Sequence, residues 1–467
     1  MKPKAELGIV AVALISVAAV LSVRNLPSIA VEGWSSVSWY VLATGLFLAP
    51  VALTAAELAS TWPRAGGVYD WVTEAFGRPT GFLAVWAMVV QNIPWYPTVL
   101  AYVAVSLAFG FDAALEHNRW FVAGVMIVTF WLLSLVALRG PALAARFIAT
   151  GTVFGSVVPA LVLIAAGVTW FAAGKHSALP PFTFAGLLPT WDPGRIPFVS
   201  SLLLAFTGLE VSGYYALAVR NPQRDYPRAM LLALVTIAGL SIAATLAIAV
   251  AIPTGQISLA GGVVQTFGVI FGGFGIGWAA PALTVLVTLG ALAGMSAWLI
   301  GPLLSLSEAS RGGLLPPAFR ALNARGAPAT IVVWQAIVVT AVSVAFALVP
   351  EVNQAYWILN ATTTALLAFY YLPIFAAIVR LRYSRPDTPR PYRIPGGTFG
   401  VWSVAGIGSL STAFAVFVAL LRPANVTFVS DAAYVIGLIV LSLLWMIPWA
   451  VFVAARRASW LPPTRAS

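Results

Sequence analysis

Two otherwise apolar stretches of this 467-residue chain each carry charged and helix-breaking residues near the middle. The first stretch, AAVLSVRNLPSIAVEGW, contains Arg24, Asn25 and Pro27. The second stretch, LLLAFTGLEVSGYYALAV, contains Gly208 and Glu210. Proline removes a backbone hydrogen-bond donor and glycine disfavours a continuous helix, so both stretches are predicted to open at these points. A guanidinium, a carboxylate and freed main-chain groups would then lie at similar depth in the molecule.

Freed main-chain groups of this kind can bind a zwitterion. The amino-terminal end of a half-helix presents unpaired N–H groups and a positive dipole to a carboxylate, while carbonyl groups opposite receive an ammonium. An α-amino acid has both charges, so it is the simplest ligand for such a site. The alternative interpretation is that glycine and proline only kink the helices for packing, as in many membrane bundles.

Composition determines the surroundings of these two stretches. Hydrophobic residues make up 61% of the chain and charged residues 8%, which is too little polar surface for a water-soluble protein of this length. Crossing roughly 30 Å of hydrocarbon takes about 20 helical residues. The sequence therefore predicts an all-α polytopic membrane protein of about twelve transmembrane helices. The predicted spans are 7–32, 36–60, 79–110, 119–138, 143–172, 196–219, 228–252, 279–309, 328–349, 353–381, 402–421 and 431–454.

The two interrupted stretches are the first and sixth of these spans. They lie about 185 residues apart, which is the spacing expected of two five-helix repeats of inverted topology. We predict a first repeat at 7–172 and a second at 196–381, followed by two further helices at 402–454. Broken helices survive in a bilayer only where they line a cavity or are buried in protein, so the breaks predict a polar cavity. Residues 66–77 and 261–271 are predicted to form short helices outside the spans, on opposite sides of the membrane.

The basic residues predict the orientation in the membrane, because lysine and arginine are retained on the cytoplasmic side during insertion. With the N-terminus inside, 20 of the 25 lie inside, four lie outside and Arg24 falls within a span. We therefore expect a multi-pass protein of the cytoplasmic (inner) membrane with both termini in the cytoplasm. The densest basic cluster follows the tenth span and either anchors the topology or contacts anionic lipid. It comprises Arg380, Arg382, Arg385, Arg390 and Arg393.

The sequence also argues against several functional classes. Cysteine is absent and both histidines, His117 and His176, fall in predicted loops, so we expect no metal or cofactor site and no enzymatic acid–base constellation. The net charge of +11 comes from scattered residues, which argues against a nucleic-acid partner. A channel would need a continuous polar lining, whereas this chain has one local interruption in each half. The oligomeric state, monomer or homodimer, stays open.

Five motifs in order carry a family resemblance: RNLP, AELASTWPRAGGVYDWVTEAFG, FTGLEVSG with NPQRDYPRAM, SAWLIGPLLSLSEASRGGLLPPAF and RPYRIPGG. Together they resemble the amino acid, polyamine and organocation (APC) transporters, and most of all the bacterial glutamate/GABA antiporter branch. The resemblance implies a LeuT-like core of two inverted five-helix repeats, with helices one and six discontinuous and two extra helices outside it. It also implies a secondary active transporter that works by alternating access, as an amino acid exchanger or a proton-coupled permease. A polyamine or organic cation permease is the alternative.

The resemblance further implies which residues form the site. Substrate binding would involve positions of the two breaks, with rings from other spans acting as gates. The implied binding residues are Val23, Arg24, Asn25, Ser28, Phe206, Thr207, Gly208, Leu209, Tyr96 and Trp298, and Trp95 is an implied gating residue. One departure is Arg24, which stands where an uncharged or aromatic residue is expected, so the substrate can differ from glutamate.

Three charged residues each have two interpretations. Arg24 either recognises a substrate carboxylate, or pairs with Glu210 or caps broken-helix carbonyls, because a guanidinium at mid-membrane must be paired or solvated. Glu210 is the candidate for proton coupling, and its alternative is a structural salt bridge. Glu57 lies near a cytoplasmic helix end, where we expect a structural or gating pair, with proton transfer as the alternative.

Polar side chains of spans three, eight and ten complete the candidate set. In span three, Gln91 and Asn92 precede Trp95 and Tyr96 and would form a wall of the cavity or pack as an aromatic turn. In the other two spans, polar side chains would face the pathway or hydrogen-bond between helices. These are Ser296, Asn360 and Thr362 to Thr364.

Overall fold

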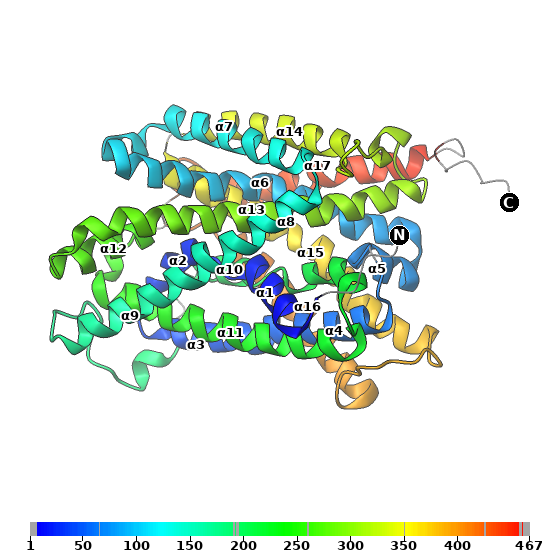
Figure 1. Cartoon of the computed structure of the whole chain (residues 1–467), viewed down its shortest axis with the longest axis horizontal. Helices are drawn as coiled ribbons and strands as arrows, with labels where there is room; N and C mark the ends of the chain where they lie inside the picture. Colours follow the sequence, from blue (N-terminus) through cyan, green and yellow to red (C-terminus); the bar gives the residue numbers. More distant parts are fainter. Residues whose placement is uncertain are drawn as a thin grey trace.

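The computed structural model describes residues 7–64, 66–189, 192, 196–258, 261–349, 351–424, 426–456 and 460. Within these ranges the regular secondary structure is helical, apart from one isolated bridge between Leu7 and Val219. Figure 1 shows most of the long helices running side by side along the long axis. The α-helices are α1 (Ile9–Val20), α2 (Pro27–Ala30), α3 (Ser35–Ala43), α4 (Ala49–Thr61), α5 (Val68–Phe76), α6 (Arg78–Phe111), α7 (Arg119–Leu138), α8 (Pro141–Thr152), α9 (Val158–Ala172), α10 (Pro197–Ala205), α11 (Pro222–Ala251), α12 (Gly262–Gly273), α13 (Ala280–Arg311), α14 (Ala329–Leu348), α15 (Val352–Ser384), α16 (Gly397–Ala419) and α17 (Asp431–Ala455).

Nine helical segments in the described part of the chain are long and apolar enough to cross a membrane. They correspond to nine of the twelve predicted spans. The three others are 7–32, 79–110 and 196–219. The second of these is α6, a continuous helix of 34 residues, whereas the first and third are interrupted. The membrane-spanning, all-helical architecture is therefore confirmed, and the count of twelve stays a prediction.

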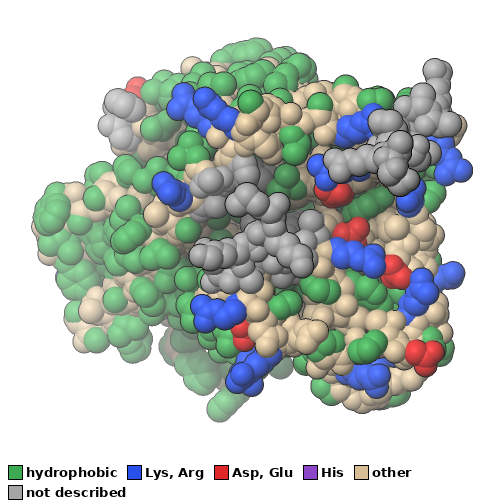
Figure 2. Space-filling model, turned by 45° about the vertical axis from the view of Figure 1, so that its right-hand side comes forward, with side chains coloured by type: hydrophobic (Ala, Val, Ile, Leu, Met, Phe, Trp, Pro, Cys, Tyr) green, Lys and Arg blue, Asp and Glu red, His purple; other side chains and the backbone are tan. Residues whose placement is uncertain are grey.

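The two short helices predicted outside the spans are present. They are α5 and α12, and they lie at opposite ends of the bundle (Figure 1). The end that carries α5 also carries the connection 385–396 between α15 and α16, and we call it the basic end. Figure 2 shows lysine and arginine gathered towards this end, whereas the opposite side is largely hydrophobic.

Two spans continue through a single π-helical turn. Residues Thr44–Leu48 (η2) join α3 to α4, and Val153–Val157 (η4) join α8 to α9. The second turn crosses α13 with its backbone in close contact, because a Cβ atom added to Gly155 would lie 2.2 Å from the backbone nitrogen of Gly290. A pair of glycines at such a crossing lets two helices approach more closely than side chains would allow.

The first predicted break is observed after α1. Leu21 and Ser22 adopt extended backbone angles, with ψ values of 106° and 108°. A short 3₁₀ turn, η1 (Val23–Asn25), follows, and Pro27 then begins α2. Proline is well suited to the first position of a helix, where its missing N–H would have no intrahelical partner. The chain therefore leaves the helix and restarts within the same span.

The second predicted break is observed after α10. Gly208 has φ of +117°, a conformation that residues with a Cβ atom rarely adopt. The chain then continues as a 3₁₀ helix, η6 (Leu209–Ala218), instead of resuming an α-helix. Gly208 is needed for space as well, because an added Cβ would lie 2.6 Å from the Trp298 ring.

Side chains from neighbouring helices partner main-chain groups at both breaks. The Trp298 indole of α13 donates to the carbonyl oxygen of Ala19 at 2.9 Å, just before the first break. The backbone N–H of Gly208 donates to the Tyr371 hydroxyl of α15 at 3.1 Å. Because Trp298 also packs against Gly208, it holds the two breaks next to each other in the centre of the molecule.

Candidate functional site

A small central cavity lies between the two breaks. It has a volume of about 30 Å³, which is enough for one or two water molecules but too small for an amino acid. Its walls come from both broken spans together with α6, α13 and α15. The lining residues are Ala19, Val20, Ser22, Asn25, Gln91, Asn92, Trp95, Leu204, Ala205, Thr207, Trp298 and Thr363.

Four of the predicted site residues line this cavity: Asn25, Trp95, Thr207 and Trp298. The seven other predicted binding residues are buried without belonging to the described lining. They are Val23, Arg24, Ser28, Phe206, Gly208, Leu209 and Tyr96. Ser28 donates to the carbonyl of Asn25, and the Tyr96 hydroxyl donates to the carbonyl of Trp298 at 3.3 Å. These residues support the walls of the cavity in this conformation.

Phe206 lines a second, smaller cavity beside the first. The two cavities share Val20, Ser22, Asn25 and Ala205, so both broken spans border both cavities. The Phe206 ring lies 5.8 Å from the ring of Tyr40, measured between centroids. An aromatic pair therefore covers the second cavity, while Trp95 and Trp298, 6.1 Å apart between centroids, flank the first.

The polar groups of α6 point to ligand binding in the central cavity. Gln91 is 2% exposed, and its side-chain carbonyl oxygen has no hydrogen-bond partner within the described structure. Its neighbour Asn92 donates to the carbonyl of Trp298 at 3.3 Å. A buried acceptor without a donor is costly, so the Gln91 oxygen is suited to receive a hydrogen bond from a ligand.

Arg24 is buried but has few partners. Its Nη1 lies 3.5 Å from the Tyr356 hydroxyl, and its guanidinium lies 5.7 Å from the centroid of the Trp95 ring. Among the residues that the structure describes, no carboxylate is within ion-pair distance of it. A guanidinium has five N–H donors, so most of its hydrogen-bonding capacity stays available.

Glu210 has a different environment on the other side of the cavity. Its carboxylate accepts a hydrogen bond from Tyr370 at 2.5 Å, and the Tyr371 hydroxyl lies 3.1 Å from both of its oxygens. Tyr371 also accepts the backbone N–H of Gly208. The carboxylate is thus linked directly to the break in the sixth span.

The proposed pair between Arg24 and Glu210 is not observed, and the geometry of α15 explains why. Arg24 contacts Tyr356 and Glu210 contacts Tyr370, which are 14 residues apart on this helix and therefore separated by about 21 Å along its axis. Thr363 lies midway between them and lines the central cavity. The cavity is consequently placed between a guanidinium on one side and a carboxylate on the other.

Glu57 lies far from this cavity, at the basic end. Arg382 Nη2 donates to both of its carboxylate oxygens at 2.7 Å, Arg390 Nε lies 3.2 Å away, and the backbone N–H of Ile394 donates at 2.8 Å. Burial lowers the pKa of Arg390 below its ordinary value, while Glu57 opposes this shift. These contacts attach the 385–396 connection to α4, and the role of the Glu57 pair, structural or gating, stays a prediction.

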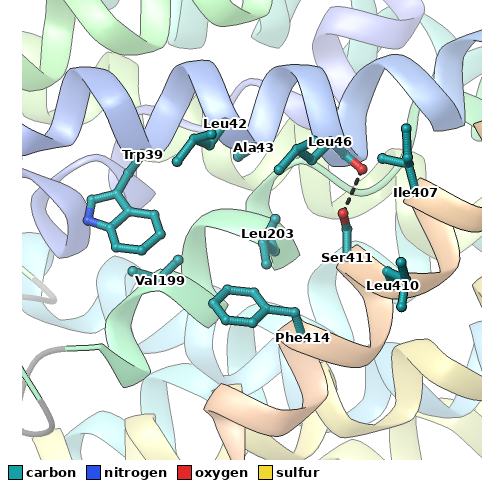
Figure 3. A pocket seen from close by; sticks show the side chains of 10 residues that line it. All are labelled: Trp39, Leu42, Ala43, Leu46, Val199, Leu203, Ile407, Leu410, Ser411 and Phe414. Carbon is teal, nitrogen blue, oxygen red and sulfur yellow. Dashed lines mark hydrogen bonds between the residues drawn. The ribbon is translucent and has the colours of Figure 1, made fainter. Parts of the chain in front are cut away.

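A larger cavity, of about 370 Å³, opens between α3, α10 and α16 (Figure 3). Its lining has no charged side chain. The Ser411 hydroxyl, drawn in Figure 3, already donates to the carbonyl of Leu46 at 2.6 Å. A zwitterion would lose its hydration there without gaining an ionic partner, so this cavity is unsuited to an amino acid.

Some lining residues were not predicted, and others were predicted only as alternatives. Gln91, Asn92 and Thr363 were candidates whose helix faces the sequence did not resolve, and here they line the cavity. Ser296 and Asn360 instead bond within the protein, to the carbonyl of Leu292 and to the hydroxyl of Ser201. Ser22 and the small residues beside it had no signal beyond their nearness to the break.

Comparison with known proteins agrees with this architecture. A profile described as amino acid permease matches residues 7–444, almost the whole chain. The chain belongs to the amino acid permease family, within the APC superfamily. As an amino acid permease family member it is a transporter.

Three relatives of this permease family member show the range of its neighbours. An uncharacterized transporter of Legionella pneumophila is 35% identical, with 96% of each chain covered. A glutamate/gamma-aminobutyrate antiporter of Lactococcus lactis is 29% identical, covering 87% of this chain and 82% of the relative. A probable agmatine/putrescine antiporter of the same species is also 29% identical, covering 82% and 81%.

Proposed function

We propose that this chain carries an amino acid across the cytoplasmic membrane as a secondary active transporter, with the substrate bound in the central cavity. The observation that carries the proposal is the pair of breaks that enclose this cavity. Alternating access requires the cavity to open to one side at a time, and its small volume fits a closed stage of that cycle. Residues 7–172 and 196–381 would be the two inverted repeats that surround this cavity.

Arg24 favours a substrate with a carboxylate over a polyamine. The guanidinium lies against Trp95, which lines the cavity, and has no described carboxylate partner. A buried positive charge would repel a diamine and attract an acid group. Both kinds of substrate are named among the relatives, so this contact supports an exchanger or permease for amino acids over the polyamine alternative.

Gln91 would receive the substrate's ammonium group. Its free side-chain oxygen and Thr207 both line the cavity, and Asn25 adds an amide from the first break. An amino acid would thus have Arg24 on one side and hydrogen-bond acceptors on the other. This arrangement supports the zwitterion hypothesis with side chains in addition to main-chain groups.

Glu210 would couple proton movement to opening. Its carboxylate binds Tyr371, and Tyr371 binds the backbone of Gly208. Protonation would weaken the acceptor capacity of the carboxylate and so loosen the contact that holds the sixth span in this conformation. We place the basic end in the cytoplasm, following the excess of arginine there, which puts Glu210 on the cytoplasmic side of the cavity and Arg24 on the external side.

The test of transport is counterflow in proteoliposomes. Vesicles loaded with an unlabelled amino acid should transiently accumulate the same radiolabelled amino acid, and saturation should occur as its concentration rises. A screen of acidic, neutral and decarboxylated compounds would identify the substrate. Linear, non-saturable flux without counterflow would identify a channel and refute the proposal.

The test of the substrate class is Arg24→Gln. Removing a charge-assisted hydrogen bond costs about 1.5–3 kcal/mol, so we expect a roughly 10- to 150-fold rise in the apparent KM for an acidic substrate. Arg146→Gln, which removes an exposed arginine of α8, is the control and should leave KM unchanged. An unaltered KM in correctly inserted Arg24→Gln would remove this residue from the binding site.

A further inference from the structure

A second large groove lies at the basic end, between α4 and α11. It has a volume of about 610 Å³, and the 385–396 connection closes one side of it. The groove is distinct from the central cavity, with which it shares no lining residue. Its lining comprises Ala49, Ala52, Leu53, Ala56, Gln223, Arg224, Pro227, Arg228, Met230, Leu231, Leu234, Pro391 and Tyr392.

The groove has an apolar part and a basic part. Along the two spans it is lined by aliphatic side chains, and Leu231 is 65% exposed although it belongs to a membrane-length helix. That exposure indicates a surface that faces lipid hydrocarbon. The first turns of α11 supply Arg224 and Arg228, which are four residues apart and therefore lie on one face of the helix.

These two arginines are free to bind an anion. Both are exposed, and neither forms an ion pair with any residue that the structure describes. The neighbouring Asp225 is not part of the groove lining. Two guanidinium groups on one helical face can hold a phosphate through several charge-assisted hydrogen bonds.

The arginines after the tenth span are engaged differently. Arg382 and Arg390 bind Glu57, Arg385 binds Glu74 at 2.9 Å, and Arg380 lies 5.1 Å from the centroid of the Phe76 ring. The cluster that the sequence suggested as a lipid contact is therefore largely occupied by the protein itself. Arg393, the fifth member of the cluster, is exposed but does not line the groove, so the basic side chains of the groove itself are Arg224 and Arg228.

We propose that this groove binds an anionic phospholipid. Its phosphate would lie between Arg224 and Arg228, and an acyl chain would follow the apolar surface past Leu53 and Leu234. Because we place the basic end at the cytoplasmic leaflet, the lipid phosphates of that leaflet would lie level with the first turns of α11. Pro391 and Tyr392 form part of the wall, so a bound lipid would contact the connection that Glu57 attaches to α4.

The test compares lipids that share acyl chains and differ in headgroup charge. Purified protein in detergent is titrated with phosphatidylglycerol, phosphatidylethanolamine or inorganic phosphate, and the midpoint of thermal unfolding is followed by tryptophan fluorescence. We expect the midpoint of thermal unfolding to rise saturably with phosphatidylglycerol and not with the other two additives. Two lost arginine contacts should raise the half-saturating concentration roughly 30-fold in the double variant Arg224→Gln/Arg228→Gln.

Two matched variants make the result specific. Arg139→Gln/Arg325→Gln removes two exposed arginines outside the groove and should keep the phosphatidylglycerol effect unchanged. Arg224→Lys/Arg228→Lys keeps the charge and should retain most of the effect, which distinguishes lost binding from lost folding. The proposal would be overturned if phosphatidylethanolamine or inorganic phosphate stabilised the protein as much as phosphatidylglycerol does. It would also be overturned if Arg224→Gln/Arg228→Gln were stabilised by phosphatidylglycerol as strongly as the parent protein.

Discussion

Replacing Gly208 by alanine is the substitution with the clearest structural consequence. The glycine has φ of +117°, and an added Cβ atom would lie 2.6 Å from a ring carbon of Trp298 and 3.2 Å from the carbonyl oxygen of Ala19. The ring cannot move away freely, because its indole N–H donates to that same carbonyl. The substitution therefore strains both breaks at once.

The size of the effect follows from two terms. An L-residue held in a sparsely populated backbone region costs about 1–3 kcal/mol. Forcing a methyl group into a packed site costs about another 1–3 kcal/mol. The two terms act at one residue and add, so we expect a loss of roughly 2–6 kcal/mol of unfolding free energy.

Thermal unfolding of the purified protein measures this loss, with Gly239→Ala as the matched control. Gly239 lies within α11 and has nothing within 4 Å of an added Cβ. Alanine is favoured over glycine inside a helix by up to about 1 kcal/mol, so the control should be as stable as the parent or slightly more stable. Equal unfolding temperatures for the two variants would show that the break at Gly208 is not constrained as described.

Other substitutions test separate parts of the structure. Gly155→Ala should destabilise the protein and lower transport, because its Cβ would meet the backbone of Gly290. Gly124→Ala in α7 is the control and should be neutral, because an added Cβ there has nothing within 4 Å. The two variants are compared by thermal unfolding and by uptake, and similar results for them would contradict the close crossing. Glu210→Gln cannot exchange a proton, so uptake driven by an imposed pH gradient should fall at least tenfold while exchange without a gradient persists. Unchanged gradient-driven uptake in this variant would exclude Glu210 from coupling.

The breaks could be predicted from sequence because their causes are local. Pro27 and Gly208 restrict the backbone itself, and each stands within an apolar stretch that would otherwise be a continuous helix. The partners of the breaks are not local. Trp298 and Tyr371 reach them from other helices, and their contacts depend on helix tilts and rotations that the sequence does not specify.

The site was predicted less completely than the fold. The family resemblance implied Asn25 and Thr207 as binding residues, and both line the cavity, but the sequence did not show which face of α6 would bring Gln91 into it. A pair between Arg24 and Glu210 was one of the alternatives for Arg24, because both are mid-membrane charges. They contact α15 at points about 21 Å apart, a separation that depends on how this long helix passes both breaks.

The account depends on a cavity that both breaks share and that opens to water during transport. The chain contains no cysteine, so a single one can be introduced at Ser22 or at Thr207 and labelled with a charged methanethiosulfonate reagent in membranes. We expect both to react and the transported amino acid to protect them, while Ser343→Cys, on the buried face of α14, should not react. Failure of Ser22→Cys and Thr207→Cys to react, or reaction that substrate leaves unaffected, would contradict the account.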